Sequence, residues 1–234
     1  MNDKIQARLE ALADEKDSSI LQWFFKTGPG QYGEGDRFRG IRVPVLRKLC
    51  REFRQAGVRE IVPLLASPWH EDRLLALLLL VDRYSSSDEA GREDIFDIYC
   101  SRTDRINNWD LVDLSAPNIV GRHLATRDRS PLYRFAVSCN LWERRIAIVS
   151  TFHFIRQGQF DDTLVISELL LGDRHDLMHK ATGWMLREVG KRDLPALERF
   201  LARHYPRIPR TTLRYAIERF PEERRRQWLK GPVS

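Results

Sequence analysis

The sequence predicts an all-α fold of stacked antiparallel helix pairs, and three observations support this prediction. Apolar residues recur at helical spacing in every long segment. No segment of useful length alternates apolar and polar residues as a half-buried strand would. Helix pairs recur at roughly 35–45 residues without a crisp repeat. We therefore expect a HEAT-like or armadillo-like α-solenoid of about ten to twelve helices, forming a single domain over residues 1–234. A compact multi-helix bundle is the alternative.

The helical pattern is clearest in residues 43–53, 71–84, 141–155 and 177–191. In the last of these, one helix face carries Met178, Ala181, Met185 and Val189. Serine, glycine and proline predict the helix breaks between such segments. The breaks fall at Ser67-Pro68, Ser85-Ser86-Ser87, Ser130-Pro131, Gly172-Asp173, residues 206–209 and Pro221.

Positive charge is concentrated in the last quarter of the chain, although the net charge of the whole is only +6. Residues 172–234 contain 15 Lys and Arg against 8 Asp and Glu, whereas residues 1–171 contain 24 against 25. This asymmetry is typical of a protein that binds a polyanion, of which nucleic acid is the commonest. The alternative is that the excess of Lys and Arg serves only solubility. In the solenoid interpretation, arginine-rich helix faces line a concave, basic DNA-binding cleft.

Several classes of protein are disfavoured by composition. No apolar run approaches the roughly 18 residues of a membrane span, and residues 1–4 lack a signal-peptide pattern, so we expect a cytoplasmic protein without membrane contact. The three cysteines, Cys50, Cys100 and Cys139, form no CxxC pair. They predict small buried thiols and neither a disulfide framework nor a zinc site.

A glycine-rich loop contains a literal G-x-G-x-x-G at Gly28, Gly30 and Gly33. The dinucleotide-binding motif requires a preceding strand and a helix that opens directly after the glycines. Here a helix is expected before the loop, and the acidic Glu34 and Asp36 would repel a pyrophosphate. The sequence therefore predicts no nucleotide cofactor.

The most informative stretch runs from Asn107 to Pro117. An asparagine can cap a helix that begins near Trp109, which places Trp109 and Asp113 one turn apart on one face. A carboxylate within an apolar stripe is costly to bury, so Asp113 should either face a functional cleft or bridge to an arginine of the next helix. Pro117 should bend the helix, because it lacks the backbone donor for the carbonyl of Asp113.

A second stretch places Trp184 in a basic helix face. The neighbouring cations are Lys180, Arg187 and Lys191. An aromatic ring among cations suits stacking against nucleic acid, whereas packing under the Lys and Arg stems is the structural alternative. Gly183 beside it allows close approach of another backbone.

Two further pairs of candidate residues, one of arginines and one of histidines, lie in the later helices. Arg144 and Arg145 cannot both face the core, so at least one should reach solvent, DNA or a carboxylate. His175 and His179 have the spacing of a helical metal pair, but no third ligand is evident. We therefore expect a solvated or phosphate-facing histidine pair and no metal.

Taken together, these stretches resemble the AlkD-like DNA alkylation repair family of HEAT-like-repeat DNA glycosylases. The resemblance covers nearly the full length. It rests on the following segments: residues 40–47, Asn108-Trp-Asp-Leu-Val-Asp113, Leu141-Trp-Glu-Arg-Arg-Ile-Ala147 and Gly183-Trp-Met-Leu-Arg-Glu188. Asn108 departs from the pattern, because some relatives have an aromatic residue there.

The resemblance implies a role for each matching residue. Asp113 matches the catalytic aspartate, Trp109 and Trp184 match the cleft tryptophans, and Arg145 matches the cleft arginine. The implied reaction is base excision repair by hydrolysis of the N-glycosidic bond of N3- or N7-alkylated purines in duplex DNA, without metal or organic cofactor. We expect Arg144, Lys180, Arg187 and Lys191 to contact DNA, and the protein to act as a monomer.

Two other functions remain open at this point. The first is a DNA-structure-binding relative without glycosylase activity, against which the retained Asp113, Trp109 and Trp184 argue. The second is a helical-repeat scaffold for protein partners, which would expose an apolar or acidic groove in place of an arginine-rich one.

Overall fold

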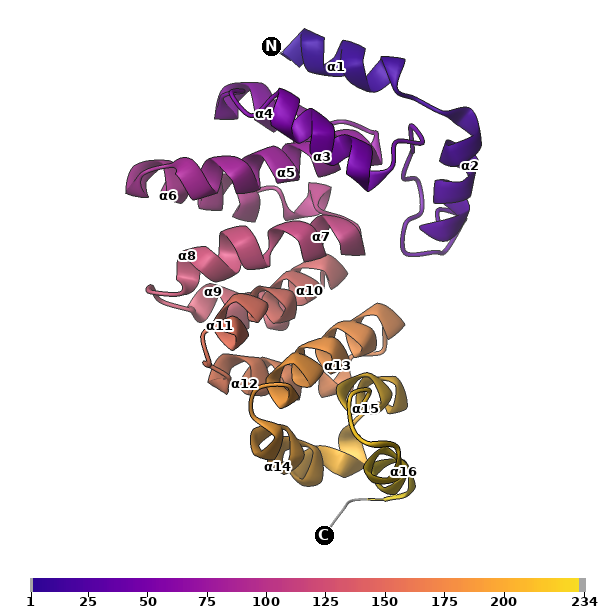
Figure 1. Ribbon diagram of the computed structural model, residues 1–234, viewed down its shortest axis with the longest axis vertical. Helices are drawn as coiled ribbons and strands as arrows, with labels where there is room; N and C mark the ends of the chain where they lie inside the picture. Colours follow the sequence, from indigo (N-terminus) through magenta and orange to yellow (C-terminus); the bar gives the residue numbers. More distant parts are fainter. Residues whose placement is uncertain (1, 232–234) are drawn as a thin grey trace. The chain divides into compact units, whose positions relative to one another are not determined.

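The structure is a computed structural model that describes residues 2–231. Every regular element in this range is helical, and no strand occurs in it (Figure 1). This confirms the all-α prediction. The chain forms two compact units, Met1–Ser115 and Ala116–Ser234. Each is described by itself, and the expectation of a single domain stays a prediction.

The first unit is organised around one long, buried helix, α5 (His70–Ser86). Its leucine-rich centre, from Leu74 to Leu80, packs against α3, α4, α6 and α7. The remaining elements of the unit are α1 (Asn2–Ala11), α2 (Glu15–Phe24), α3 (Val43–Glu52), α4 (Val58–Leu65), α6 (Glu89–Cys100), a 3-10 turn (Thr103–Arg105) and α7 (Trp109–Ser115).

The second unit is organised around α13 (Asp176–Gly190), which packs against α10, α12, α14 and α15. A cluster of buried residues that includes Leu186, Leu197, Leu213 and Trp228 joins α13 to the last three helices. The remaining elements are a π-helical turn (Pro117–Gly121), α8 (Arg122–Leu124), α9 (Ser130–Ala136), α10 (Leu141–Ser150), α11 (Phe152–Arg156), α12 (Asp161–Leu169), α14 (Leu194–His204), α15 (Arg210–Ala216), α16 (Glu222–Lys230) and 3-10 turns at Leu170–Gly172 and Tyr205–Arg207.

The helices expected from apolar spacing are present, but they are more numerous and several are shorter than expected. The segments at 43–53, 71–84 and 177–191 correspond to α3, α5 and α13. The segment at 141–155 is interrupted at Thr151, whose hydroxyl donates to the carbonyl of Ile148 at 2.7 Å. Helices α7, α8, α9, α11 and α15 have seven residues or fewer.

The expected irregularity at Pro117 takes the form of a π-helical turn. Helix α7 ends at Ser115, and the N–H of Gly121 then donates to the carbonyl of Ala116 at 2.9 Å, five residues back. Proline has no N–H to donate, and the helix accommodates this absence by widening by one residue at this turn.

Gly183 has the close backbone neighbour that its position predicts. A Cβ at this residue would lie 2.5 Å from Cβ of Tyr215 and 2.6 Å from the carbonyl oxygen of Thr212. Helix α15 therefore packs directly on the backbone of α13.

The glycine-rich loop stabilises itself through its own side chains. The N–H of Gly28 donates to Oε1 of Gln31 at 3.0 Å, and the N–H of Gly30 donates to Oε2 of Glu34 at 2.9 Å. The preceding element is α2 and the next helix begins only at Val43, so the loop does not have the context of a dinucleotide site.

The cysteines depart from expectation in one case. All three are free thiols, Cys50 and Cys100 are partly buried, and Cys139 is exposed. The prediction of a buried thiol at Cys139 is wrong, because Cys139 lies in the turn before α10 instead of within a helix. Among the helices described, none combines the length and the apolar character of a membrane span.

Candidate active site

The first unit contains a pocket of about 530 Å³ that includes both Trp109 and Asp113. Its walls come from α2, the segment after the glycine-rich loop, the start of α5, and α7. The other lining residues are Leu21, Phe24, Phe25, Phe38, Ile41, Arg42, Val43, Pro44, His70, Glu71, Leu74, Asp110 and Leu114. The lining is mainly apolar and aromatic, with a few charged groups, as is usual for a small-molecule or base-binding site.

Helix α7 presents Trp109 and Asp113 to this pocket from successive turns. The helix begins at Trp109, whose N–H donates to Oδ1 of Asn108 at 2.8 Å. Trp109 and Asp113 are both half-buried. Both line the pocket, so the prediction that they share one face is confirmed, and Asp113 is one of the few charged residues in a mainly apolar and aromatic lining.

Aromatic rings from α2 and the loop fix the position of Trp109. The ring centroid of Trp109 lies 5.3 Å from that of Phe25 with an interplanar angle of 22°, a stacked arrangement. Phe24 meets Trp109 edge-on at 6.1 Å. Phe25 also stacks on Phe38 at 5.0 Å. Three elements thus contribute to one continuous aromatic wall.

A buried histidine of the pocket lining, His70, lies between two carboxylates. Nδ1 of His70 is 2.9 Å from Asp36, and Nε2 is 2.9 Å from Asp110. Burial opposes the charged ring, but attraction and hydrogen bonding to Asp110 and Asp36 outweigh it and raise the pKa of His70 to about 9. Asp36 also accepts from Nη2 of Arg73 at 2.7 Å. Burial opposes its charged form too, yet His70 and Arg73 together lower the pKa of Asp36.

The next two residues of α5 anchor the segment that leads into α3. The carboxylate of Glu71 accepts from the backbone N–H of Arg39, Gly40 and Ile41 at 2.9, 2.9 and 3.1 Å. Nε of Arg39 donates to Asp72 at 2.7 Å. These buried charges are all paired, which is what makes their burial tolerable.

Apolar spacing did not reveal this network. His70, Glu71, Asp72 and Arg73 are all buried, although four such residues in succession read as a solvated helix start. The only signal is that they stand directly before the most apolar run of the chain. A charged turn that leads directly into a buried leucine-rich run has little surface to occupy.

The other two predicted catalytic residues belong to the second unit. Arg145 on α10 is buried, and its Nη1 donates to the carbonyl of Leu177 at 2.8 Å. Trp184 on α13 is half-buried, with the ring of Phe152 at 5.8 Å. Neither lines the pocket of the first unit.

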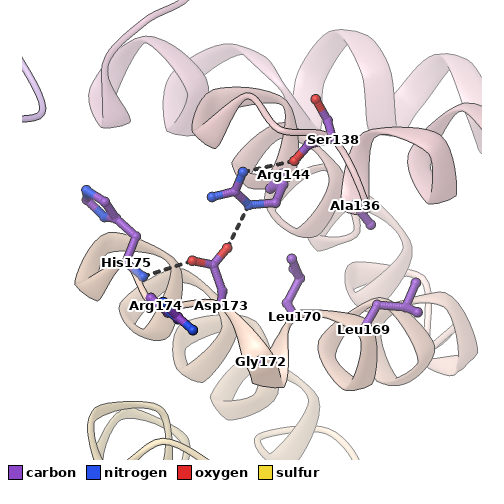
Figure 2. Close-up of a pocket in the computed structure, with 9 residues that line it drawn as sticks. All are labelled: Ala136, Ser138, Arg144, Leu169, Leu170, Gly172, Asp173, Arg174 and His175. Carbon is purple, nitrogen blue, oxygen red and sulfur yellow. Dashed lines mark hydrogen bonds and ion pairs between the residues drawn. The ribbon is translucent and has the colours of Figure 1, made fainter.

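Arg144 lines a second pocket of about 540 Å³, within the second unit (Figure 2). Nε of Arg144 donates to Asp173 at 2.7 Å, and Nη1 donates to the carbonyl of Ser138 at 2.9 Å. Asp173 also accepts from the N–H of His175 at 2.9 Å (Figure 2). Arg144 thus reaches a carboxylate, which meets the expectation that at least one of the two adjacent arginines reaches solvent, DNA or a carboxylate.

The other predicted DNA-binding cations also have acidic partners. Lys180 pairs with Asp176 at 2.6 Å and Lys191 pairs with Glu188 at 2.5 Å. Arg187 pairs with Glu218 and lies 3.9 Å from Glu188. Contact with a phosphate would require these cations to leave or share their carboxylates.

The histidine pair has local roles at the start of α13. Nδ1 of His175 accepts from the N–H of Leu177 at 3.2 Å, which caps the helix. Nε2 of His179 lies 2.6 Å from the carbonyl oxygen of Asp173. Within residues 2–231, no group of three or more His, Cys, Asp or Glu side chains has a metal-binding arrangement.

Comparison with known proteins identifies the family. The sequence model of the family described as DNA alkylation repair enzyme matches residues 5–220. A solved structure from Enterococcus faecalis, described as a predicted DNA alkylation repair enzyme, aligns with a TM-score of 0.71 over 90% of this chain and 97% of that chain. At 15% identity this likeness shows the fold alone. Among curated proteins none matches significantly. The match over nearly the whole chain confirms the resemblance noted in the sequence: the chain belongs to the family of DNA alkylation repair enzymes.

Proposed function

We propose that the protein is a DNA glycosylase that hydrolyses the N-glycosidic bond of N3- or N7-alkylated purines in duplex DNA. One observation carries the proposal: Asp113 lines the same pocket as the electron-rich rings of Trp109, Phe24 and Phe25. Such a pocket favours a cationic group, and both the alkylated base and the sugar it leaves carry positive charge along the reaction.

The chemistry needs little from the protein beyond charge stabilisation. An alkylated purine is already cationic, so the bond electrons move onto the base without a general acid. Positive charge then develops on the sugar, and water adds to C1′ as a proton passes to Asp113 or to solvent. A carboxylate about 4 Å from that charge contributes about 4 kcal/mol at an effective dielectric of 20, on the order of a thousandfold in rate.

The second unit supplies DNA contacts in this proposal. Trp184, like Trp109, offers an electron-rich face to the cationic nucleotide, and Arg145 holds the backbone phosphate. Arg144, Lys180, Arg187 and Lys191 contact neighbouring phosphates as their carboxylate partners are exchanged for DNA. A monomer suffices, and no metal or organic cofactor takes part.

Base release from duplex DNA containing 7-methylguanine tests the proposal. We expect the wild type to release the free base and Asp113→Asn to lose at least a hundredfold in rate while DNA affinity is retained. Asp94→Asn is the control, because Asp94 is an exposed aspartate on α6 outside the pocket.

Two results would contradict this function. No release by the wild type from either N3- or N7-alkylated DNA, with DNA binding intact, would leave a DNA-binding protein without glycosylase activity. Equal rates for the wild type and Asp113→Asn would remove Asp113 from the reaction.

A further inference from the structure

His70 occupies an unusual position for a histidine that no reaction step uses. It is 2% exposed, and both ring nitrogens lie 2.9 Å from carboxylates of different elements. Its first partner, Asp36, belongs to the loop before α3. Its second partner, Asp110, is the second residue of α7 and also accepts from the N–H of Leu111 at 2.9 Å. One ring therefore joins three segments at the start of the helix that carries Trp109 and Asp113.

The same ring also underlies the aromatic wall. The centroids of Phe25 and Phe38 lie 4.9 and 4.5 Å from that of His70. Phe25 in turn stacks on Trp109. His70 thus reaches Trp109 by two routes, through the carboxylate of the adjacent Asp110 and through the ring of Phe25.

We propose that His70 is a positioning residue for the active-site helix, whose doubly hydrogen-bonded, charged ring sets the placement of Trp109 and, one turn later, Asp113. Its link to Asp110 fixes the first turn of α7, while its tilted contact with Phe25 supports the wall against which Trp109 rests. His70 touches no reacting atom in this role.

The charge of the ring matters for both routes. A neutral imidazole has one N–H and can donate to only one of the two aspartates, whereas the imidazolium donates to both. The imidazolium also interacts more favourably with the faces of Phe25 and Phe38. The pKa of about 9 places His70 in its charged form at neutral pH.

Several charged groups lie near the ring or line the same pocket, but only Asp110 and Asp36 raise the pKa of His70. Asp36 comes from the loop, Asp110 and Asp113 come from α7, and Arg42 lines the same pocket at the start of α3. On its own helix, Glu71 is held by the backbone of 39–41, and Arg73 is paired with Asp36. The acidic partners that contact the ring directly are Asp36 and Asp110.

A matched pair of variants separates the two hydrogen bonds. His70→Gln places an amide N–H near the position of Nε2 and keeps the donor to Asp110. His70→Asn places its amide near the position of Nδ1 and keeps only the donor to Asp36. Both variants remove the charge and the ring, so the donor to Asp110 is what distinguishes them. If the link to Asp110 positions α7, the glutamine variant stays closer to the wild type than the asparagine variant does.

The direct readout is the 19F NMR spectrum of protein labelled with 5-fluorotryptophan, which requires no catalytic activity. The chain has 6 tryptophans, and Trp109→Phe assigns the resonance of interest. We expect His70→Asn to shift the Trp109 resonance more than His70→Gln does, with the resonances of Trp142, Trp184 and Trp228 unchanged in both. An unmoved Trp109 resonance in His70→Asn would overturn the proposal.

A pH titration of the wild type tests the proposal even if the variants fail to fold. The wild-type Trp109 resonance should titrate between pH 8 and 10 with a midpoint near the pKa of about 9, because the neutral ring releases one aspartate. A Trp109 resonance that does not respond in this range would also overturn the proposal.

The activity measurement rests on the proposed glycosylase function. At saturating enzyme, the single-turnover rate of 7-methylguanine release should fall at least tenfold in His70→Asn and by a smaller factor in His70→Gln, with the Kd for DNA unchanged. If the wild type releases no base, the glycosylase function fails while the 19F measurement still decides the positioning role. Equal rates for both variants and the wild type would refute the positioning role.

Discussion

Trp109 stacks on Phe25 with ring centroids 5.3 Å apart, and this contact joins the first helical turn of α7 to the end of α2. The two residues are more than 80 positions apart in the chain. The wall beside Asp113 therefore depends on tertiary packing and not on α7 alone.

This contact predicts that Phe25→Leu reduces base release by about two- to tenfold, because an aromatic pair contributes about 0.5–1.5 kcal/mol beyond its buried area. Single-turnover rates and urea unfolding should be measured together. Phe53→Leu is the matched control, since both phenylalanines are 7% exposed and Phe53 lies outside the pocket. Equal losses of rate in the two variants would show that the stack has no special role.

The three backbone hydrogen bonds to Glu71 predict that replacing its carboxylate by an amide strongly destabilises the fold. Glu71→Gln leaves one acceptor oxygen and turns an NH2 group toward the amides of residues 39–41. We expect the free energy of unfolding to fall by about 2–4 kcal/mol, since buried donors lose a charged acceptor. Urea unfolding measures this, and the exposed Glu10→Gln is the control. A change below about 0.5 kcal/mol for Glu71→Gln would contradict the assigned role.

The difference between what the sequence predicted and what it missed follows from the range of the interactions. Helices α3, α5 and α13 follow from apolar spacing within single segments. The placement of Trp109 and Asp113 on one face follows from helical periodicity alone. The His70 network does not, because its partners lie 34 and 40 residues away and are brought together only by folding. Local pattern likewise gives no indication that Arg187 and Glu218, 31 residues apart, are paired.

Gly183→Ala should destabilise the second unit by about 1–3 kcal/mol, because its Cβ would overlap the backbone and side chain of α15. Gly172→Ala is the control, since a Cβ there meets nothing within 4 Å. Thermal unfolding of both variants checks the difference. Equal stability of the two would contradict the close packing of α13 and α15.

His70 predicts a specific dependence of stability on pH. Its folded pKa of about 9 lies above the ordinary value of 6.5, so its contribution is complete below pH 6.5 and is lost as pH rises through about 9. The difference corresponds to about 3 kcal/mol. Urea unfolding from pH 6 to 10 should show this loss in the wild type, and the loss should be absent in His70→Gln. Parallel curves for the two proteins would contradict a charged His70.

The ion pair between Arg144 and Asp173 predicts that the Asp173 carboxylate weakens DNA binding, because it competes with phosphate for Arg144. Asp173→Asn keeps the oxygen that accepts from the N–H of His175 and removes the charge that holds Arg144. We expect tighter DNA binding and a plot of log Kobs against log salt that steepens by up to about 0.9, the value for one additional phosphate contact.

A double-variant cycle distinguishes release of Arg144 from a general change in charge. In an Arg144→Ala background, Asp173→Asn should have no effect on the slope. Asp94→Asn removes the same charge from the exposed face of α6 and should leave the slope unchanged. If Asp173→Asn steepens the slope equally with and without Arg144, then Arg144 does not reach a phosphate, and the gain reflects only the lost negative charge.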